Sequence, residues 1–281
     1  MAETLISPGV LQRENDQSFI TQQPVQVGAA VVGPTVKGPV EIPTVVTSYS
    51  DYQNRFGTTF LSASEEYSFL TSIQAYNYFQ NGGNTLLVTR VVSGSTGWGY
   101  AESNISCSDD SDIAFTLEAI DKGVIFNNSG SQLSNGALTS GSADNIRWEV
   151  AASSSAQGTF DLLIRKGNDN TNNKIVLESF TGLSLDPTQD NYVARVIGDY
   201  KYQYDETNNY VKIVSGSHPN ASRYVRVKSV TSKTPNYFDN AGEAKTDLTG
   251  SIPQFGSGSL GGAFTGGAGT VINGSAPNNM Y

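Results

Sequence analysis

The chain has 281 residues, with 37% apolar and 15% charged side chains and a formal net charge of −9. This length is enough to bury one large core or two ordinary ones, and we expect at least two domains. The excess of acidic residues argues against direct nucleic-acid binding, and the single cysteine, Cys107, excludes an intrachain disulfide.

Residues 1–24 are predicted to form an extended N-terminal arm. Ser7-Pro8-Gly9-Val10 is a turn signal, and residues 12–18 are polar and lack helical periodicity. The start has neither the basic residues nor the apolar run of a signal peptide, and no apolar stretch is long enough to span a membrane. We therefore expect folding in the cytoplasm.

Residues 25–98 are predicted to form a sheet-and-helix segment. A strand at 25–32 is stopped by Gly33-Pro34, a second turn follows at Gly38-Pro39, and a short strand covers 45–47. A single helical turn over 50–57 would be capped by Ser50 and closed by Gly57, next to Phe56.

The most specific local pattern lies between residues 62 and 92. Ser62 and Glu65 have the spacing of a capping box, which predicts a helix start at this point. Phe69, Ile73 and Tyr76, with Leu70 beside them, form a stripe that we expect to pack on a sheet. Gly82 after Asn81 predicts the C-terminal cap, and residues 86–92 read as a buried strand.

A break in composition near Gly94 marks a domain boundary, and residues 99–235 are predicted to form a β-rich domain. Its expected strands lie at 113–120, 124–126, 146–151, 159–165, 174–180, 192–197, 210–214 and 224–230. Residues 236–281 are rich in Gly and Ser and are predicted to be a connection outside the core. The final residues 277–281 resemble a helix start, so we expect the natural chain to continue.

Candidates for chemistry are few. His218 lies in a polar turn, and a serine or cysteine nucleophile such as Cys107 would have no other imidazole partner. Asp109, Asp110 and Asp112 fit a solvated loop better than a calcium site, and the glycines at 256–269 lack the Lys-Ser/Thr ending of a phosphate loop. We expect no enzyme activity, no cofactor, no metal and no small-molecule substrate.

In combination, three segments resemble the contractile tail sheath proteins of bacteriophages. They are Ser7-Pro8-Gly9-Val10, the stretch from Gly33-Pro34 and Gly38-Pro39 to Phe56-Gly57, and residues 78–92 with Phe79, Asn81, Gly82 and Gly83. Residues 159–164 and 177–187 resemble the segment that many sheath proteins place before their central core. The resemblance covers roughly residues 7–230.

The resemblance implies an α+β fold with an inner sheet-and-helix core, an inserted β-rich outer domain, and a C-terminal half of the core that is absent here. It implies a structural subunit of stacked, hexameric rings in a helical lattice. The implied partners are further copies, the tail tube protein, the baseplate and the tail terminator, in the virion tail. The arm that links subunits would use Leu5, Ile6, Ser7, Pro8, Gly9, Val10, Leu11, Phe19 and Ile20.

Two alternatives remain open at this point. A non-phage contractile injection system uses the same type of subunit. A surface-binding β-domain could recognise carbohydrate through Tyr200, Tyr202 and Tyr204, which alternate with Lys201 and Gln203, although such alternation is more often packing.

Overall fold

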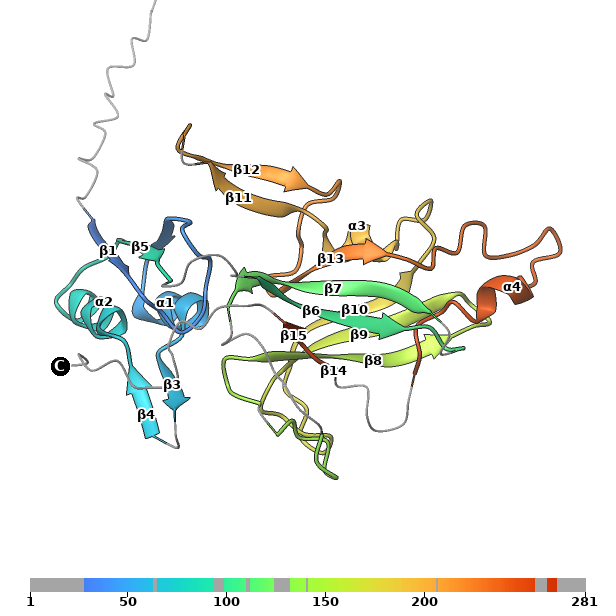
Figure 1. Ribbon diagram of the computed structural model, residues 1–281, viewed down its shortest axis with the longest axis horizontal. Helices are drawn as coiled ribbons and strands as arrows, with labels where there is room; N and C mark the ends of the chain where they lie inside the picture. The colour runs from blue at the N-terminus through green and yellow to red at the C-terminus, as the bar shows by residue number, and fades with distance from the viewer. Residues whose placement is uncertain are drawn as a thin grey trace, which may run out of the picture.

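The computed structural model describes residues 28–62, 65–92, 99–109, 112–123, 132–139, 141–205, 207–255 and 262–266. Strands hold 42% and helices 14% of the structure, so the predicted α+β class is confirmed. Two bodies lie next to each other in Figure 1: a small lobe, residues 28–92, and a large lobe, residues 99–266.

The small lobe is built on a three-stranded sheet in the order β1–β5–β2. Its strands are β1 (Ala29–Gly33), β2 (Thr44–Val46) and β5 (Leu86–Arg90). β1 runs parallel and β2 antiparallel to β5. The alternating burial of β5 places Leu86 and Val88 in the core, because successive side chains of a strand point to opposite faces.

Helix α1 (Tyr49–Phe56) contributes Tyr52 and Phe56 to the core of this lobe. Its cap is Ser48, whose Oγ accepts from the Asp51 N–H at 3.1 Å, so the predicted cap at Ser50 is wrong by two residues. Gly57 closes the helix as predicted, with φ of 71°. The element is two turns long, longer than expected.

Helix α2 (Leu70–Gln80) differs from the prediction at its start and in its buried face. Ser62 and Glu65 do not cap it, because they form the paired end of a hairpin between β3 (Thr59–Ser62) and β4 (Glu65–Ser68). The helix begins after Phe69, which offers no side-chain cap. The C-terminal cap at Asn81 and Gly82 is confirmed, with Gly82 at φ of 87°.

The buried face of α2 is made of small residues. Thr71, Ser72 and Ala75 are buried, whereas Ile73 and Tyr76 of the predicted stripe are 41% and 45% exposed. A Cβ on Gly33 of β1 would lie 2.4 Å from Oγ1 of Thr71, so helix and strand approach at a distance that only glycine permits. Close packing therefore buries the small face of the helix.

The large lobe is a sandwich of two four-stranded sheets, in the orders β13–β7–β6–β15 and β10–β9–β8–β14. The first sheet consists of β6 (Tyr100–Ser106), β7 (Ile113–Lys122), β13 (Val225–Val230) and β15 (Thr265–Gly266). The second consists of β8 (Ile146–Ser154), β9 (Thr159–Lys166), β10 (Val176–Ser184) and β14 (Gly262–Ala263). Phe115 and Phe160, whose ring centroids are 5.4 Å apart, join the two inner faces.

The last described segment belongs to the core, against the prediction that residues after 235 stay outside it. β14 pairs with β8 and β15 pairs with β6, so the chain crosses from one sheet to the other within five residues. Phe264 stands at the crossing and is fully buried, as is Ile252. A glycine-rich composition does not prevent single apolar side chains from closing the open side of a sandwich.

Of the other predicted strands, those at 113–120, 146–151, 159–165, 174–180, 210–214 and 224–230 correspond to strands of the structure, within a few residues at their ends. The prediction at 192–197 is wrong, because this segment is helix α3 (Val193–Ile197), closed by Gly198 at φ of 104°. Residues 124–126 lie outside the described part of the chain. The polar segment 103–112 contains most of β6, which was not predicted.

Two smaller elements extend from the sandwich. β11 (Lys201–Asp205) and β12 (Tyr210–Ser215) form a separate two-stranded hairpin above it in Figure 1. Helix α4 (Thr246–Thr249) lies at the end of the sandwich that is farther from the small lobe.

Candidate functional site

The two lobes are joined by a buried arginine. Arg90, the last residue of β5, is fully buried, and its Nη1 donates to the carbonyl oxygens of Gly38 at 2.6 Å and of Lys122 at 3.2 Å. Burial lowers the pKa of the Arg90 guanidinium, and the nearby Asp121 carboxylate opposes this effect. Burial also raises the pKa of the Asp121 carboxyl to about 6, against the opposing effect of Arg90.

The residues of the second resemblance segment meet around α1. The Lys37 N–H donates to the Phe56 carbonyl at 3.1 Å, and a Cβ on Gly38 would lie 2.7 Å from the Phe56 ring. A Cβ on Gly57 would lie 2.8 Å from Val36. Both glycines have positive φ, 107° and 71°. These positions are architectural, since they let a turn pack directly against a helix end.

The third resemblance segment, residues 78–92, also has an architectural role. The Gly83 N–H donates to the Tyr78 carbonyl, and a Cβ on Gly83 would overlap the Tyr78 ring at 2.3 Å. The Tyr78 hydroxyl donates to the Thr85 carbonyl at 2.8 Å, and its ring packs edge-on against Phe79. Asn81 holds the helix end, with its Nδ2 donating to the Asn77 carbonyl.

The other residues of the predicted structural motif and the predicted arm lie elsewhere in the chain. Gly33 closes β1, and Pro34 and Pro39 lie in the turns that follow it. The nine predicted arm residues between Leu5 and Ile20 lie outside the described part of the chain. The structure therefore brings the glycine, proline and aromatic positions together within the small lobe and leaves the arm residues as predictions.

One face of the small sheet has no cover among the described residues. α1 and α2 pack on the face of Val31, Val46 and Val88. The opposite face carries Val32 and Val45, which are 68% and 51% exposed. The register places both beside β5 residues, so they share one surface, which we call the open sheet face and define as Ala30, Val32, Val45, Leu87 and Thr89.

The outer side of α2 is a second apolar surface. Leu70, Ile73 and Tyr76 are each between 41% and 45% exposed. The Tyr76 ring packs edge-on against Tyr49 of α1, with centroids 5.1 Å apart. Contiguous apolar surface of this kind marks interaction sites more often than isolated exposed residues do.

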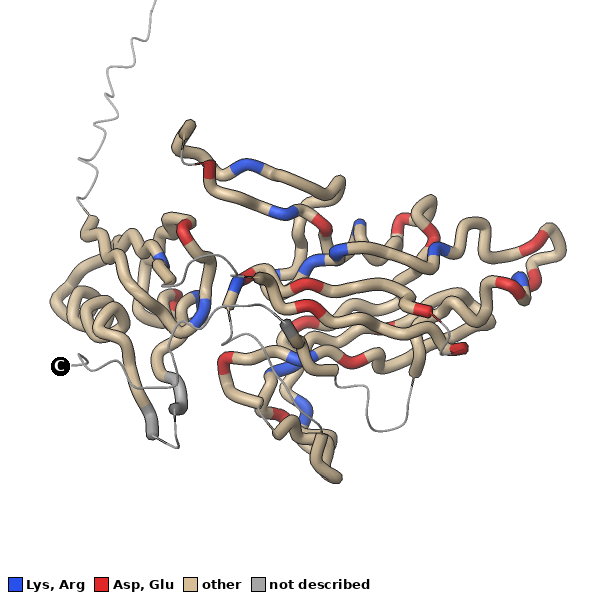
Figure 2. The backbone as a smooth tube through the Cα atoms, viewed as in Figure 1, with Lys and Arg blue, Asp and Glu red and all other residues tan. Residues whose placement is uncertain are grey.

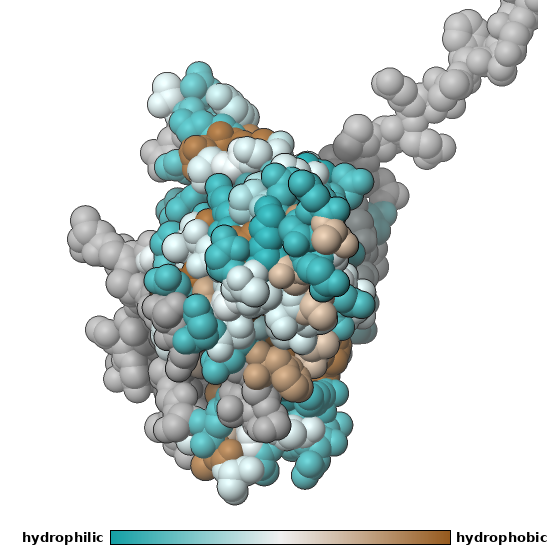
Figure 3. All heavy atoms as spheres, turned by 90° about the vertical axis from the view of Figure 1, so that its right-hand side faces the viewer, coloured by the Kyte–Doolittle hydropathy of each residue, from teal (hydrophilic) through white to brown (hydrophobic). Residues whose placement is uncertain are grey.

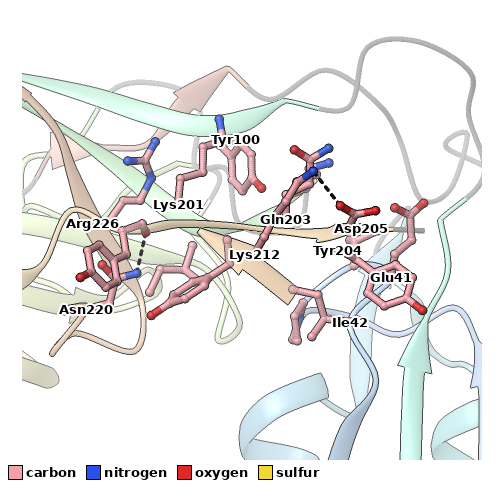
Figure 4. A pocket seen from close by; sticks show the side chains of 16 residues that line it. Glu41, Ile42, Tyr100, Lys201, Gln203, Tyr204, Asp205, Lys212, Asn220 and Arg226 are labelled. Carbon is pink, nitrogen blue, oxygen red and sulfur yellow. Dashed lines mark hydrogen bonds and ion pairs between the residues drawn. The ribbon is translucent and has the colours of Figure 1, made fainter. Parts of the chain in front are cut away.

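A groove of about 340 Å³ lies between the β11–β12 hairpin, residues 39–42 and the ends of β6 and β7. Figure 4 shows the tyrosine and lysine side chains that line it. Tyr200, Tyr202 and Tyr204 of the carbohydrate hypothesis all reach it, together with Tyr100, which the sequence did not single out.

The candidates for chemistry are not brought together. His218 Nδ1 lies 3.4 Å from Oδ2 of Asp199, and Oδ1 of Asp199 accepts hydrogen bonds from the backbone N–H groups of Ser217 and His218, so the pair organises a turn. Cys107 is buried in the sandwich, where burial raises the pKa of its thiol. Within the described ranges, no group of three or more metal-ligating side chains occurs.

Neither the role of Arg90 nor the groove is predicted from the sequence. Arg90 was visible as the one cation in an apolar strand, which is a position that requires a buried partner. The groove is assembled from segments up to 187 positions apart, Pro39 to Arg226, which no local pattern connects. In the part of the chain that the structure describes, no helix is long and apolar enough to span a bilayer.

Comparison with solved structures finds several chains that match this one, and two of them are sheath tail proteins. One is the sheath tail protein Lin1278 from Listeria innocua, at 12% identity and a TM-score of 0.33, with 73% of this chain and 35% of that chain covered. The other is the sheath tail protein DSY3957 from Desulfitobacterium hafniense, at 12% identity and a TM-score of 0.31, with 79% and 40% covered. The chain thus spans less than half of either. No family model and no curated relative matches it.

Proposed function

We propose that this chain is a structural subunit of a contractile phage tail sheath, which polymerises around the tail tube and contracts to drive the tube through the bacterial envelope. The observation that carries the proposal is the small sheet. The sheet carries one helical layer. Among the described residues, nothing covers the open sheet face, and neither outer strand, β1 or β2, has a strand paired on its outer side. Such edges and faces are used for pairing between chains.

Residues 1–24 are the proposed linker between subunits. An extended segment can add as a strand to the sheet of a neighbour, gaining main-chain hydrogen bonds and side-chain contacts with a small interface. Repetition of the same head-to-tail contact makes a helical lattice. We take residues 25–98 as the inner core segment and the β-sandwich between residues 99 and 266, which β14 and β15 complete, as the outward insertion.

The Arg90 contact suggests how the subunit behaves in contraction. Because Nη1 of Arg90 bonds Gly38 of the small lobe and Lys122 of the large lobe, the two lobes are expected to move as one body. Flexible arms between such bodies would keep the subunits linked during a large rearrangement. The proposed partners are copies of the chain in stacked six-membered rings, the tail tube, the baseplate and the tail terminator, in the virion.

Electron microscopy of the purified chain tests this function. Tubes of stacked rings are expected from the wild type, and a variant without residues 1–20 is expected to remain in small particles. Asp190→Ala, an exposed change in the large lobe, is the control and should leave the tubes intact. A wild type that forms no tubes alone or with a tail tube protein would contradict the proposed function. Normal tubes from the deletion variant would contradict the role of the arm.

A further inference from the structure

The groove beside the β11–β12 hairpin combines aromatic walls with cations. Tyr100 forms one side, and Nζ of Lys201 and Lys122 lie 4.6 Å and 5.5 Å from the centroid of its ring. Tyr202 and Tyr204, which also line the groove, belong to β11 of the hairpin. An ammonium group held over an aromatic face retains its charge for a further partner.

Cations outnumber anions among the residues that line the groove. The lining contains Lys122, Lys201, Lys212 and Arg226 against Glu41 and Asp205. Lys212 is paired with Asp205 at 3.0 Å, and Arg226 with the buried Glu118 at 2.8 Å. Lys201 lies 3.9 Å from Glu118, and Lys122 has no ion pair with any described residue. With Glu118 included, the groove has four cations and three anions, so one positive charge is in excess, in a chain of net charge −9.

The end of the large lobe that is farther from the small lobe carries several acidic residues. The loop between Phe238 and Ala244 is closed by an isolated bridge, and the Asp239 N–H donates to the Glu243 carbonyl at 2.9 Å. Oδ1 of Asp239 accepts from the N–H groups of Ala241 and Glu243, which fixes the turn and helps to lower the pKa of that carboxyl. The loop is therefore held in one conformation.

This loop carries an exposed aromatic ring among carboxylates. Phe238 is 45% exposed, and its ring packs edge-on against Tyr237, which is buried beside Gly158. Glu243 is exposed five residues further along the chain and Asp247 of α4 nine residues further, with the partly buried Lys245 between them. Figure 2 shows acidic positions gathered at this end of the molecule, and Figure 3, which looks onto it, shows a mainly hydrophilic surface.

We propose that the groove binds the Phe238–Ala244 loop of a second copy of this chain. The Phe238 ring enters between the tyrosines, and Glu243 and Asp247 face Lys122 and Lys201. The volume is sufficient, because a cavity of about 150 Å³ already holds a benzene ring and the groove measures about 340 Å³. The two surfaces differ, so the contact is head to tail and does not close on itself.

The inference rests on the proposed function in one respect, the association of copies, and adds a contact that does not involve the arm. Charge complementarity sets the partner and the orientation. A buried aromatic side chain supplies the kind of anchor that dominates protein interfaces.

Charge reversal on each side, followed by recombination, tests the contact. Lys122→Glu with Lys201→Glu reverses the groove, and Glu243→Lys with Asp247→Lys reverses the loop region. Each pair is expected to raise the concentration needed for self-association, measured by sedimentation velocity, by about tenfold or more. The quadruple variant should recover most of this loss. Arg223→Glu, an exposed change that does not line the groove, is the matched control, and circular dichroism verifies folding.

Disulfide trapping gives a second readout that does not depend on tubes. Gln203→Cys protein mixed with Asn240→Cys protein is expected to form a mixed disulfide dimer under mild oxidation, since the native Cys107 is buried. Gln203→Cys mixed with Asp190→Cys should not.

The outcomes separate this contact from the proposed function. Tubes that form normally with both charge-reversed variants overturn the contact and leave the sheath function standing. Specific mixed disulfides without any tubes support the contact and contradict the sheath function. Absence of both overturns the contact. A glycan array that retains the chain through Tyr202 and Tyr204, without self-association, also overturns it and favours carbohydrate as the ligand.

Discussion

Nη1 of Arg90 donates a 2.6 Å hydrogen bond to the carbonyl oxygen of Gly38, across 52 positions of the chain. The same atom bonds the Lys122 carbonyl in the large lobe. Nε and Nη2 of this buried guanidinium have no hydrogen-bond partner among the described residues. One side chain thus ties a turn of the small lobe to a strand end of the large lobe.

Arg90→Met should destabilise the chain strongly. The change leaves the Gly38 and Lys122 carbonyls and the Asp121 carboxylate without their cation, and breaking a buried charge contact from one side costs about 3–5 kcal/mol. Arg55→Ala is the control, because its exposed pair with Asp51 contributes less than about 1 kcal/mol. Urea unfolding measures the free energy of unfolding of both variants. Equally small decreases in the two variants would contradict the role given to Arg90.

Asp121 should make stability depend on pH. Its pKa of about 6 in the folded chain exceeds the ordinary value of 3.8, so the folded state binds the proton more tightly than the unfolded state. The free energy of unfolding from this group therefore falls as pH rises from about 4 to 6, by at most about 3 kcal/mol. Asp121→Asn should remove that slope in a series of urea titrations. If the free energy of unfolding of the variant still falls over this pH range, a group other than Asp121 causes the pH dependence.

Gly38→Ala should destabilise the small lobe by about 2–4 kcal/mol, because alanine meets both a φ of 107° and the Phe56 ring at 2.7 Å. Gly82→Ala is the matched comparison. Its φ is 87°, but no atom lies within 4 Å of the new Cβ, so about 1–2 kcal/mol is expected. Thermal unfolding measures the loss of stability in each variant. The difference between them gives the cost of the contact with the Phe56 ring beyond the cost of backbone strain. An equal loss in both variants would show that the Phe56 ring moves aside without cost.

Phe264→Ala should cost about 3–5 kcal/mol, since it empties a buried site between the two sheets. Phe255→Ala, at a side chain 54% exposed, should change the free energy of unfolding by less than about 0.5 kcal/mol. Calorimetry of both variants measures the difference. A small effect at Phe264 would mean that β14 and β15 do not hold the sandwich closed.

Val45→Asp should block assembly without unfolding the subunit, because Val45 lies on the open sheet face and is 51% exposed. The next residue, Val46, is fully buried, so Val46→Asp should unfold the small lobe instead. Circular dichroism and electron microscopy of the two variants distinguish the cases. Normal tubes from Val45→Asp would show that this face stays in water.

The sequence predicts well those elements whose signal is local. Alternation identified most strands of the sandwich, and Gly57 and Gly82 marked helix ends because positive φ favours glycine at these positions. The start of α2 was misplaced because Ser-x-x-Glu spacing also fits the end of a hairpin such as Ser62 and Glu65.

The errors arise where packing overrides hydrophobicity. α2 turns Thr71 and Ala75 inward because Gly33 allows close approach, and the larger Leu70 and Ile73 remain outside. Three of the six residues 192–197 are β-branched, yet α3, which covers Val193–Ile197, is a short helix that packs on β13 and β10. The groove, like the burial of Phe264, depends on contacts between distant segments and leaves no local trace in the sequence.

The parallel pairing of β1 with β5 has a mechanical consequence. Five register pairs connect the two strands, from Ala29 with Leu86 to Gly33 with Arg90. A pull on β1 from its N-terminal side acts along the strand, so the inter-strand hydrogen bonds share the load in shear and do not peel apart one by one. At its far end this ladder reaches Arg90, so tension entering through β1 is passed on to the large lobe.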